Sequence, residues 1–253
     1  MIKFLMILLL TIITVEAVAE HIVPVTDRPA DFVNAQQIIP QLQVDMRYDS
    51  AHNFVGRRIK GYKEPVCLLT QQAAYALKTV ETQLLAKGLT LKAYDCYRPQ
   101  TAVNDFIEWA NKVNDVTMRS EFYPAINKAD LFKKGYIASP SGHSRGSTLD
   151  LTIVPLNSHI PLYDPRAKQV SCAAPQQERS PDNSLDFGTS YDCFSPMSHP
   201  NYPGISADAR KNRALLRTLM KHAGFKPIAT EWWHFTLINE PYPNTYFDFP
   251  VRN

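Results

Sequence analysis

SGHSRGSTLDLTIV, residues 141–154, passes from a glycine-containing turn into a run rich in β-branched and aliphatic residues, which is typical of a strand. Asp150 stands between Leu149 and Leu151 in that run, so its carboxylate should be at least half buried. An unpaired carboxylate in such a place would cost several kcal/mol or would take up a proton. Because a bound metal ion would resolve this conflict, the segment indicates a metal site on a strand.

The elements that precede this segment are marked by capping and breaking residues. Thr70 can cap a helix over residues 71–87, and residues 89–97 then alternate like a strand. Pro99 suits the first turn of a second helix, because its missing N–H has no partner there in any case. Arg98 is therefore expected at a strand-to-helix junction.

The elements that follow complete the expected fold. Ser206 or Asp208 begins a helix that Gly224 ends, and residues 225–238 form a strand-like run. Helices and strands thus alternate without a regular βαβ rhythm. The sequence predicts an α+β fold with a mainly antiparallel sheet, in one domain over residues 20–253.

Composition limits the class of protein and partner. A chain of 253 residues with 45% hydrophobic content can bury a full core. The formal net charge is +3, and acidic and basic residues are mixed along the chain without a block of like charges. This pattern argues against a nucleic-acid-binding surface and favours a small-molecule partner.

The N-terminal segment has the three parts of a secretory signal peptide. Lys3 precedes an apolar run over residues 4–15, and Ala17-Val18-Ala19 forms an A-x-A cleavage site. A membrane anchor is the alternative, but the apolar run is shorter than the ~20 residues that a spanning helix needs. We expect residues 1–19 to be removed and the remaining chain to be periplasmic, with no membrane association after cleavage.

Four cysteines in an exported protein are expected to form disulfides, for which three pairings exist. None of them forms a C-x-x-C motif, so a four-cysteine zinc site has little support. Cys172 and Cys193 bracket a polar segment whose closure would contribute on the order of 3 kcal/mol. Our hypothesis pairs these two and leaves Cys67 with Cys96.

His143, Asp150 and His234 are candidate metal ligands, since two imidazoles and one carboxylate suit Zn²⁺ with a fourth position left for water. A single histidine near a strand is more often simply hydrogen-bonded. Glu231, three residues before His234, would face the opposite side of a regular strand, or could be a strand-end residue facing solvent. His143 and Asp150 are seven residues apart and would also face opposite sides of a regular strand. Gly146 offers a bend between these two, but nothing obvious does so between Glu231 and His234. Spacing alone therefore supports the metal site only weakly.

Several motifs resemble one enzyme family. SGHSRGSTLD, YDCYRP and EWWHF match, in order, the S-x-H-x-x-G-x-x-x-D, Y-R-P and E-x-x-H signatures of the D-alanyl-D-alanine dipeptidases, zinc enzymes related to those of vancomycin resistance. DMRYDSAHNFVG, FGTSYDCFSPMSHP and EPYPNTYFDFPV also resemble family segments. The resemblance implies a small α+β fold whose antiparallel sheet carries a zinc cleft, and one Zn²⁺ per chain.

The resemblance also implies roles for five residues. His143, Asp150 and His234 would bind zinc, and Glu231 would act as general base and acid for the attacking water. Arg98 would stabilise the oxyanion that forms when the peptide carbonyl becomes tetrahedral. The alternative for Arg98 is an ordinary surface arginine.

Three further residues resemble positions that hold the dipeptide. Asp192 would pair with the free ammonium, Tyr48 would close the same end of the pocket, and Ser141 would contact the substrate. Each also has a structural alternative, because Ser141 could cap a turn, Asp192 could be an exposed loop acid, and Tyr48 could belong to the core. Cys96 replaces the small residue that is more usual before Y-R-P, so a disulfide there could stiffen the strand-to-helix junction that presents Arg98.

Three functions compete at this point. The first is hydrolysis of D-Ala-D-Ala by a periplasmic zinc dipeptidase. The second is a zinc D,D-carboxypeptidase that trims peptidoglycan stem peptides, and the third is a non-catalytic binding module of hedgehog type. Glu231 and Arg98 argue against the third, because a binding module needs neither. The resemblance of both chain ends to the shorter dipeptidases favours the first.

Overall fold

A computed structural model describes residues 23–253, so the expected signal peptide at residues 1–19 lies outside the described part. No helix within residues 23–253 combines the length and apolarity needed to cross a bilayer. The strands are β1 (Phe32–Asn34), β2 (Gln43–Val44), β3 (Leu68–Thr70), β4 (Leu89–Asp95), β5 (Thr148–Pro155), β6 (Phe225–Pro227) and β7 (His234–Leu237), and the α-helices are α1 (Gln71–Leu85), α2 (Gln100–Asn111), α3 (Arg119–Phe122) and α4 (Ala207–His222).

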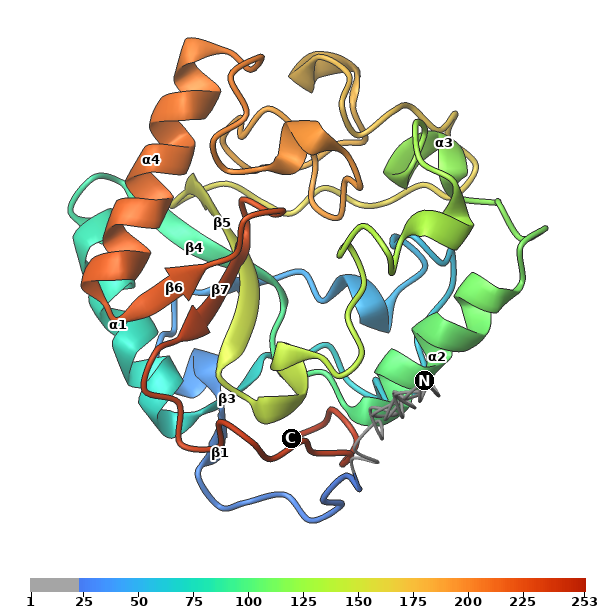
Figure 1. Ribbon diagram of the computed structural model, residues 1–253. Coiled ribbons are helices and arrows are strands. Elements are labelled where there is room, and N and C mark those ends of the chain that lie inside the picture. Colours follow the sequence, from blue (N-terminus) through green and yellow to red (C-terminus); the bar gives the residue numbers. More distant parts are fainter. Residues whose placement is uncertain (1–22) are drawn as a thin grey trace, which may run out of the picture.

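A five-stranded sheet in the order β2-β4-β5-β7-β6 forms the centre of the molecule. Only the β2–β4 pair is parallel, and the β4–β5, β5–β7 and β6–β7 pairs are antiparallel. Figure 1 shows α1 and α4 on one side of this sheet, with α2, α3 and long loops on the other. The predicted α+β class and mainly antiparallel sheet are confirmed.

Side-chain caps begin the two long helices where the sequence predicts. The hydroxyl of Thr70 accepts a hydrogen bond from the backbone N–H of Ala73 at the start of α1. Ser206, rather than Asp208, caps α4 by accepting from the N–H of Ala209 at 3.0 Å. Each cap satisfies one of the N–H groups that a helix start leaves without a partner.

The expectation of one strand over residues 225–238 was wrong. The segment forms two strands, β6 and β7, which pair as an antiparallel hairpin with Pro227 opposite Phe235. Pro227 has no N–H with which to continue the ladder, so β6 ends there and the chain turns back through residues 228–233. Glu231 consequently precedes β7, and strand alternation does not constrain its direction.

Two disulfides tie the sheet and its loops together. Cys67 is bonded to Cys96, which joins the end of β4 to the residue before β3. Cys172 is bonded to Cys193 and closes a long irregular segment after β5. All four cysteines are buried, and the pairing is the one that we predicted from loop closure.

Candidate active site

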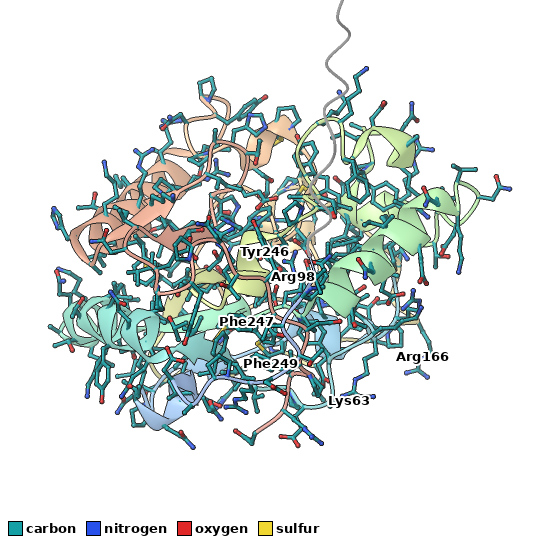
Figure 2. All side chains as sticks on the ribbon, turned by 60° about the horizontal axis from the view of Figure 1, so that its bottom comes forward. Lys63, Arg98, Arg166, Tyr246, Phe247 and Phe249 are labelled. Atoms are coloured by element: carbon teal, nitrogen blue, oxygen red, sulfur yellow. A yellow bond between two sulfur atoms is a disulfide. The ribbon has the colours of Figure 1, made fainter. Side chains whose placement is uncertain are left out.

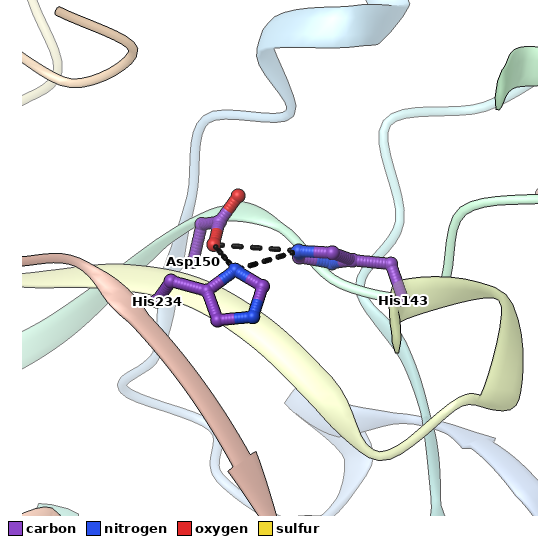
Figure 3. A group of neighbouring side chains, drawn as sticks. All are labelled: His143, Asp150 and His234. Atoms are coloured by element: carbon purple, nitrogen blue, oxygen red, sulfur yellow. Dashed lines mark hydrogen bonds and ion pairs between the residues drawn. The ribbon is translucent and has the colours of Figure 1, made fainter. Parts of the chain in front are cut away.

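Three neighbouring strands bring polar side chains into one row. Asp95 at the end of β4 lies opposite Asp150 in β5, and Asp150 lies opposite His234 at the start of β7. His143 reaches the row from a short 3₁₀ helix, Gly142–Arg145, that precedes β5. Figure 3 shows the side chains of His143, Asp150 and His234 converging on one point.

The donor atoms of His143, Asp150 and His234 form a compact triangle. His143 Nε2 lies 3.2 Å from His234 Nδ1 and 3.4 Å from Asp150 Oδ1, and His234 Nδ1 lies 3.1 Å from Asp150 Oδ1. A tetrahedral zinc ion about 2.0–2.1 Å from each donor would place the donors roughly 3.3–3.4 Å apart. The residues present therefore fit a metal ion of this size.

Asp150 supplies an independent indication of a cation site. Its Oδ1 atom is fully buried and has no hydrogen-bond partner among the described residues. Burial alone would raise the pKa of Asp150, but the two neighbouring imidazoles hold that pKa well below its usual range. The carboxylate is thus charged, buried and directed at two imidazole nitrogens, which is the chemistry of a metal ligand.

The orientation of the His143 ring is fixed by a hydrogen bond on the side away from the triangle. Its Nδ1 atom lies 2.8 Å from the carbonyl oxygen of Cys96, so Nδ1 carries the proton and Nε2 offers its lone pair to the triangle. The 3₁₀ turn that presents His143 ends at Gly146, whose φ is 82°. A Cβ atom at Gly146 would also lie 2.2 Å from the ring of Phe32, so only glycine fits there.

Glu231 faces the triangle from the segment before β7. Its Oε2 atom lies 3.6 Å from His234 Nδ1, and the residue is buried. Burial raises the pKa of Glu231 well above its ordinary value, and the negative charges of Asp150 and Asp192 act in the same direction. A carboxyl group held in this way is suited to exchanging a proton near neutral pH.

Arg98 is buried and held by Asp95, a residue that sequence reasoning missed. Arg98 Nε donates to Asp95 Oδ2 at 2.9 Å, and the guanidinium lies over the Tyr48 ring at 5.0 Å. Tyr62 donates to the other oxygen of Asp95 at 2.6 Å. Arg98, labelled in Figure 2, has only 9% of its surface exposed, which excludes an ordinary surface arginine.

Tyr48 and Asp192 form the opposite end of the cleft. The Tyr48 hydroxyl donates to Asp192 Oδ2 at 2.8 Å, and both residues are buried. Burial raises the pKa of Asp192 to about 8, with a further contribution from Asp150. Asp192 has a φ of 55°, the one positive φ among the described non-glycine residues. A residue held in this sparsely populated conformation is often part of a functional site.

Two contacts refine the predictions at this end. Ser141 is buried, and its Oγ accepts from the N–H of His143 at 3.3 Å, which is the capping role that we considered as its alternative. Tyr191, which sequence reasoning missed, donates to Asp150 Oδ2 at 3.0 Å and lies 3.3 Å from the Tyr48 hydroxyl. Tyr191 therefore connects the metal triangle to the Tyr48–Asp192 pair.

One cleft contains every predicted metal, catalytic and substrate residue. Phe54, Phe106 and Phe194 add apolar surface, and residues 135–138 form one wall. The predicted residues that line it are Tyr48, Arg98, Ser141, His143, Asp150, Asp192, Glu231 and His234. Asp95 and Tyr191 lie behind it, and the signal for both was their position beside a motif residue, in YDCYRP and TSYDC respectively.

A triangle of two imidazoles and one carboxylate, with a free carboxyl group beside it, defines the site of a metallopeptidase. The model of the peptidase family described as D-ala-D-ala dipeptidase matches residues 28–162 and 176–252. The chain belongs to this family. Residues 163–175 lie between the two matched segments.

Curated relatives agree with the family match over nearly their whole length. A D-alanyl-D-alanine dipeptidase of Enterococcus faecalis is 34% identical over 220 residues, which cover 87% of this chain and 98% of the relative. The enzyme of the same name from Enterococcus faecium is 33% identical, with the same coverage. An Escherichia coli D-alanyl-D-alanine dipeptidase is 29% identical over 82% of this chain and 84% of its own.

Proposed function

We propose that this protein hydrolyses the dipeptide D-Ala-D-Ala to two molecules of D-alanine, that it requires zinc, and that it acts in the periplasm. The observation that carries the proposal is one cleft with a donor triangle, Glu231 and Arg98 at one end and the buried Tyr48–Asp192 pair at the other. The names of the relatives support the same substrate.

His143, Asp150 and His234 would hold the metal. Two imidazole nitrogens and one carboxylate oxygen are the ligand set of many catalytic zinc sites, and this set leaves a position for solvent or substrate. Zinc bound there would polarise the peptide carbonyl and make the attacking water more acidic.

Glu231 is placed to move the proton in both halves of the reaction. As a carboxylate it takes a proton from the attacking water, and it then gives this proton to the nitrogen of the departing D-alanine. Its buried position beside His234 keeps bulk water from competing for that proton. The raised pKa of Glu231 favours the first step, because a carboxylate of higher pKa is a stronger base toward the attacking water.

Arg98 would act on the carbonyl oxygen. Negative charge grows on this oxygen as the carbon becomes tetrahedral, and a buried guanidinium stabilises it more strongly than an exposed one would. Asp95 holds Arg98 through contacts to both Nε and Nη2, at 2.9 and 2.8 Å, so the cation is oriented before substrate arrives. Such prior orientation avoids a reorganisation cost during the reaction.

Asp192 would select a free dipeptide. An ammonium group that enters beside the Tyr48–Asp192 pair gains an ion pair in a buried place, whereas a blocked amine gains none and needs more room. The same end is closed by Tyr191 and by the ring of Tyr48. This geometry favours D-Ala-D-Ala over a longer stem peptide, because only the free dipeptide ends in an ammonium at this point.

The proposed location rests on the signal sequence in residues 1–19 and on the presence of two disulfides, which persist in oxidising compartments. N-terminal sequencing of the protein recovered from a periplasmic extract tests it. Cleavage after Ala19 is expected, and an intact N-terminus in the cytoplasmic fraction would contradict export.

The central test measures D-alanine release by the purified protein, with and without a chelator. Release from D-Ala-D-Ala that stops with the chelator and returns with zinc is expected. N-acetyl-D-Ala-D-Ala, the stem pentapeptide and L-Ala-L-Ala should be poor substrates in the same assay. Equal cleavage of the pentapeptide and the dipeptide would replace the proposal with a D,D-carboxypeptidase activity.

A further inference from the structure

The loop closed by Cys172 and Cys193, here called the 172–193 loop, contains Asp192 next to its second cysteine. Cys172 lies in residues 163–175, outside the segments that match the family model. The disulfide therefore joins Cys172, in the segment that the family model does not match, to Cys193. Cys193 directly follows Asp192, the carboxylate that is proposed to bind the amine.

The closed end of this loop is fixed by backbone hydrogen bonds as well as by the disulfide. The N–H of Ser190 donates to the Cys172 carbonyl at 2.9 Å, and the N–H of Cys172 donates to the Glu121 carbonyl at 2.8 Å. The N–H of Phe194 donates to the Phe122 carbonyl at 2.8 Å. Asp192 thus lies in a short stretch that is held on both sides, which maintains its φ of 55°.

The middle of the loop is held by ion pairs between Asp182 and two basic side chains. Asp182 Oδ2 lies 2.7 Å from Arg47 Nη2, and Asp182 Oδ1 lies 2.7 Å from Lys92 Nζ. The Lys92 side chain is fully buried and that of Arg47 is 6% exposed, so both cations need nearby carboxylates. Asp182 shares this role with Asp45, whose Oδ2 lies 2.8 Å from Arg47 Nε and 3.9 Å from Lys92 Nζ. The Tyr94 hydroxyl also donates to Asp182, at 2.9 Å.

Both partners of the Tyr48–Asp192 hydrogen bond are consequently held through their neighbours in sequence. Arg47, which precedes Tyr48, is paired with Asp182, and Cys193, which follows Asp192, is bonded to Cys172. The Tyr94 ring, held by Asp182, stacks on the Tyr191 ring with centroids 4.4 Å apart.

We infer that the 172–193 loop is a positioning element for the amine-binding end of the cleft, in which Asp182 and the Cys172–Cys193 disulfide fix the Tyr48–Asp192 pair and so set the preference for a free amine. The inference rests on the proposed function. Neither Asp182 nor the two cysteines line the cleft. A misplaced Asp192 weakens substrate capture, while the donors on β5 and β7 and the attack on the carbonyl keep their geometry.

The test compares two variants that disturb the loop by different routes, Cys172→Ser/Cys193→Ser and Asp182→Asn. Each should raise KM for D-Ala-D-Ala roughly tenfold, keep kcat within about threefold and keep the zinc content of wild type. The ratio of kcat/KM for D-Ala-D-Ala to that for N-acetyl-D-Ala-D-Ala should fall in parallel.

Asp164→Asn is the matched control for Asp182→Asn. Asp164 is also in a loop and pairs with an arginine, but the pair is exposed, and Figure 2 shows Arg166 at the edge of the molecule. This variant should keep the KM of wild type.

Calorimetry of D-Ala-D-Ala binding to Glu231→Gln, with and without Asp182→Asn, gives a readout that does not depend on turnover.

Each outcome decides the inference. If either loop variant folds and keeps KM and selectivity within about twofold of wild type, the loop does not position Asp192. A fall in kcat or zinc content at unchanged KM would likewise overturn the inference and would assign the loop a general structural role. An inactive wild type would instead count against the proposed function, and the binding measurement would still test the loop.

Discussion

Replacing Glu231 with Gln isolates proton transfer from every other property of the site. The two side chains have nearly the same shape, and the contact of Glu231 Oε2 with His234 Nδ1, at 3.6 Å, is too long for a hydrogen bond, so none is lost. The substitution removes a negative charge that lies near Asp150 and Asp192. Folding stability should therefore be unchanged or slightly increased.

The expected loss of activity follows from the role of the carboxylate. A positioned general base contributes on the order of 10²–10⁴ in rate, which corresponds to about 3–5 kcal/mol of transition-state stabilisation. An amide cannot take a proton from water, so kcat should fall by that factor. The three donors of the triangle are untouched, and zinc content and KM should stay close to those of wild type.

D-alanine release, metal analysis and a thermal melt on one preparation check these expectations. Glu81→Gln is the control, because Glu81 is another buried glutamate but lies on α1, bonded to Thr90 outside the cleft. It should keep kcat. A Glu231→Gln protein that retains more than about a tenth of wild-type kcat would refute the proton-transfer role, and one that loses zinc would make Glu231 a ligand.

Five other substitutions test the remaining roles. His143→Ala, Asp150→Ala and His234→Ala should each lower the zinc content measured after dialysis, and full occupancy in one variant would remove that residue from the ligand set. Arg98→Lys should reduce kcat by roughly 10²-fold at similar KM in steady-state assays, because a lysine ammonium cannot reproduce the several directed N–H contacts of the guanidinium. An unchanged kcat would argue against oxyanion stabilisation by Arg98. Asp192 must lose its proton to pair with an ammonium, and its raised pKa of about 8 means that KM should fall as pH rises from about 6 to 8. Asp192→Asn should raise KM and abolish that slope, and a wild-type KM that rises with pH over this range would contradict the ion pair.

The sequence was sufficient for the starts of the long helices and for the residues that line the cleft, but not for the β6–β7 hairpin or for Asp95 and Tyr191. Thr70, Ser206 and Pro99 mark helix starts by local chemistry, and local chemistry does not depend on the rest of the fold. Asp150 stood out because a charged residue inside an apolar strand requires a partner somewhere. These inferences needed only neighbours in the chain.

The remaining features depend on contacts between distant segments. The return of the chain after Pro227 was missed because residues 225–238 were taken as one strand, although Pro227 cannot continue a ladder and marks the end of β6. The bulge in β4 between Ala93 and Asp95 places Asp95 opposite Asp150, and strict alternation along β4 does not predict this register. The role of Tyr191 depends on hydroxyls from segments that are far apart in sequence.

The two ends of the cleft are built from different kinds of structure, and this difference separates metal binding from substrate selection. Asp150 and His234 occupy paired positions in adjacent strands, so the sheet hydrogen bonds that fix the fold also fix their spacing. Asp192 lies in irregular chain, where no ladder fixes the backbone and other bonds must do so. Changes in the loops should therefore alter which amine is accepted, and changes in β5 or β7 should alter metal binding and the rate of the chemical step.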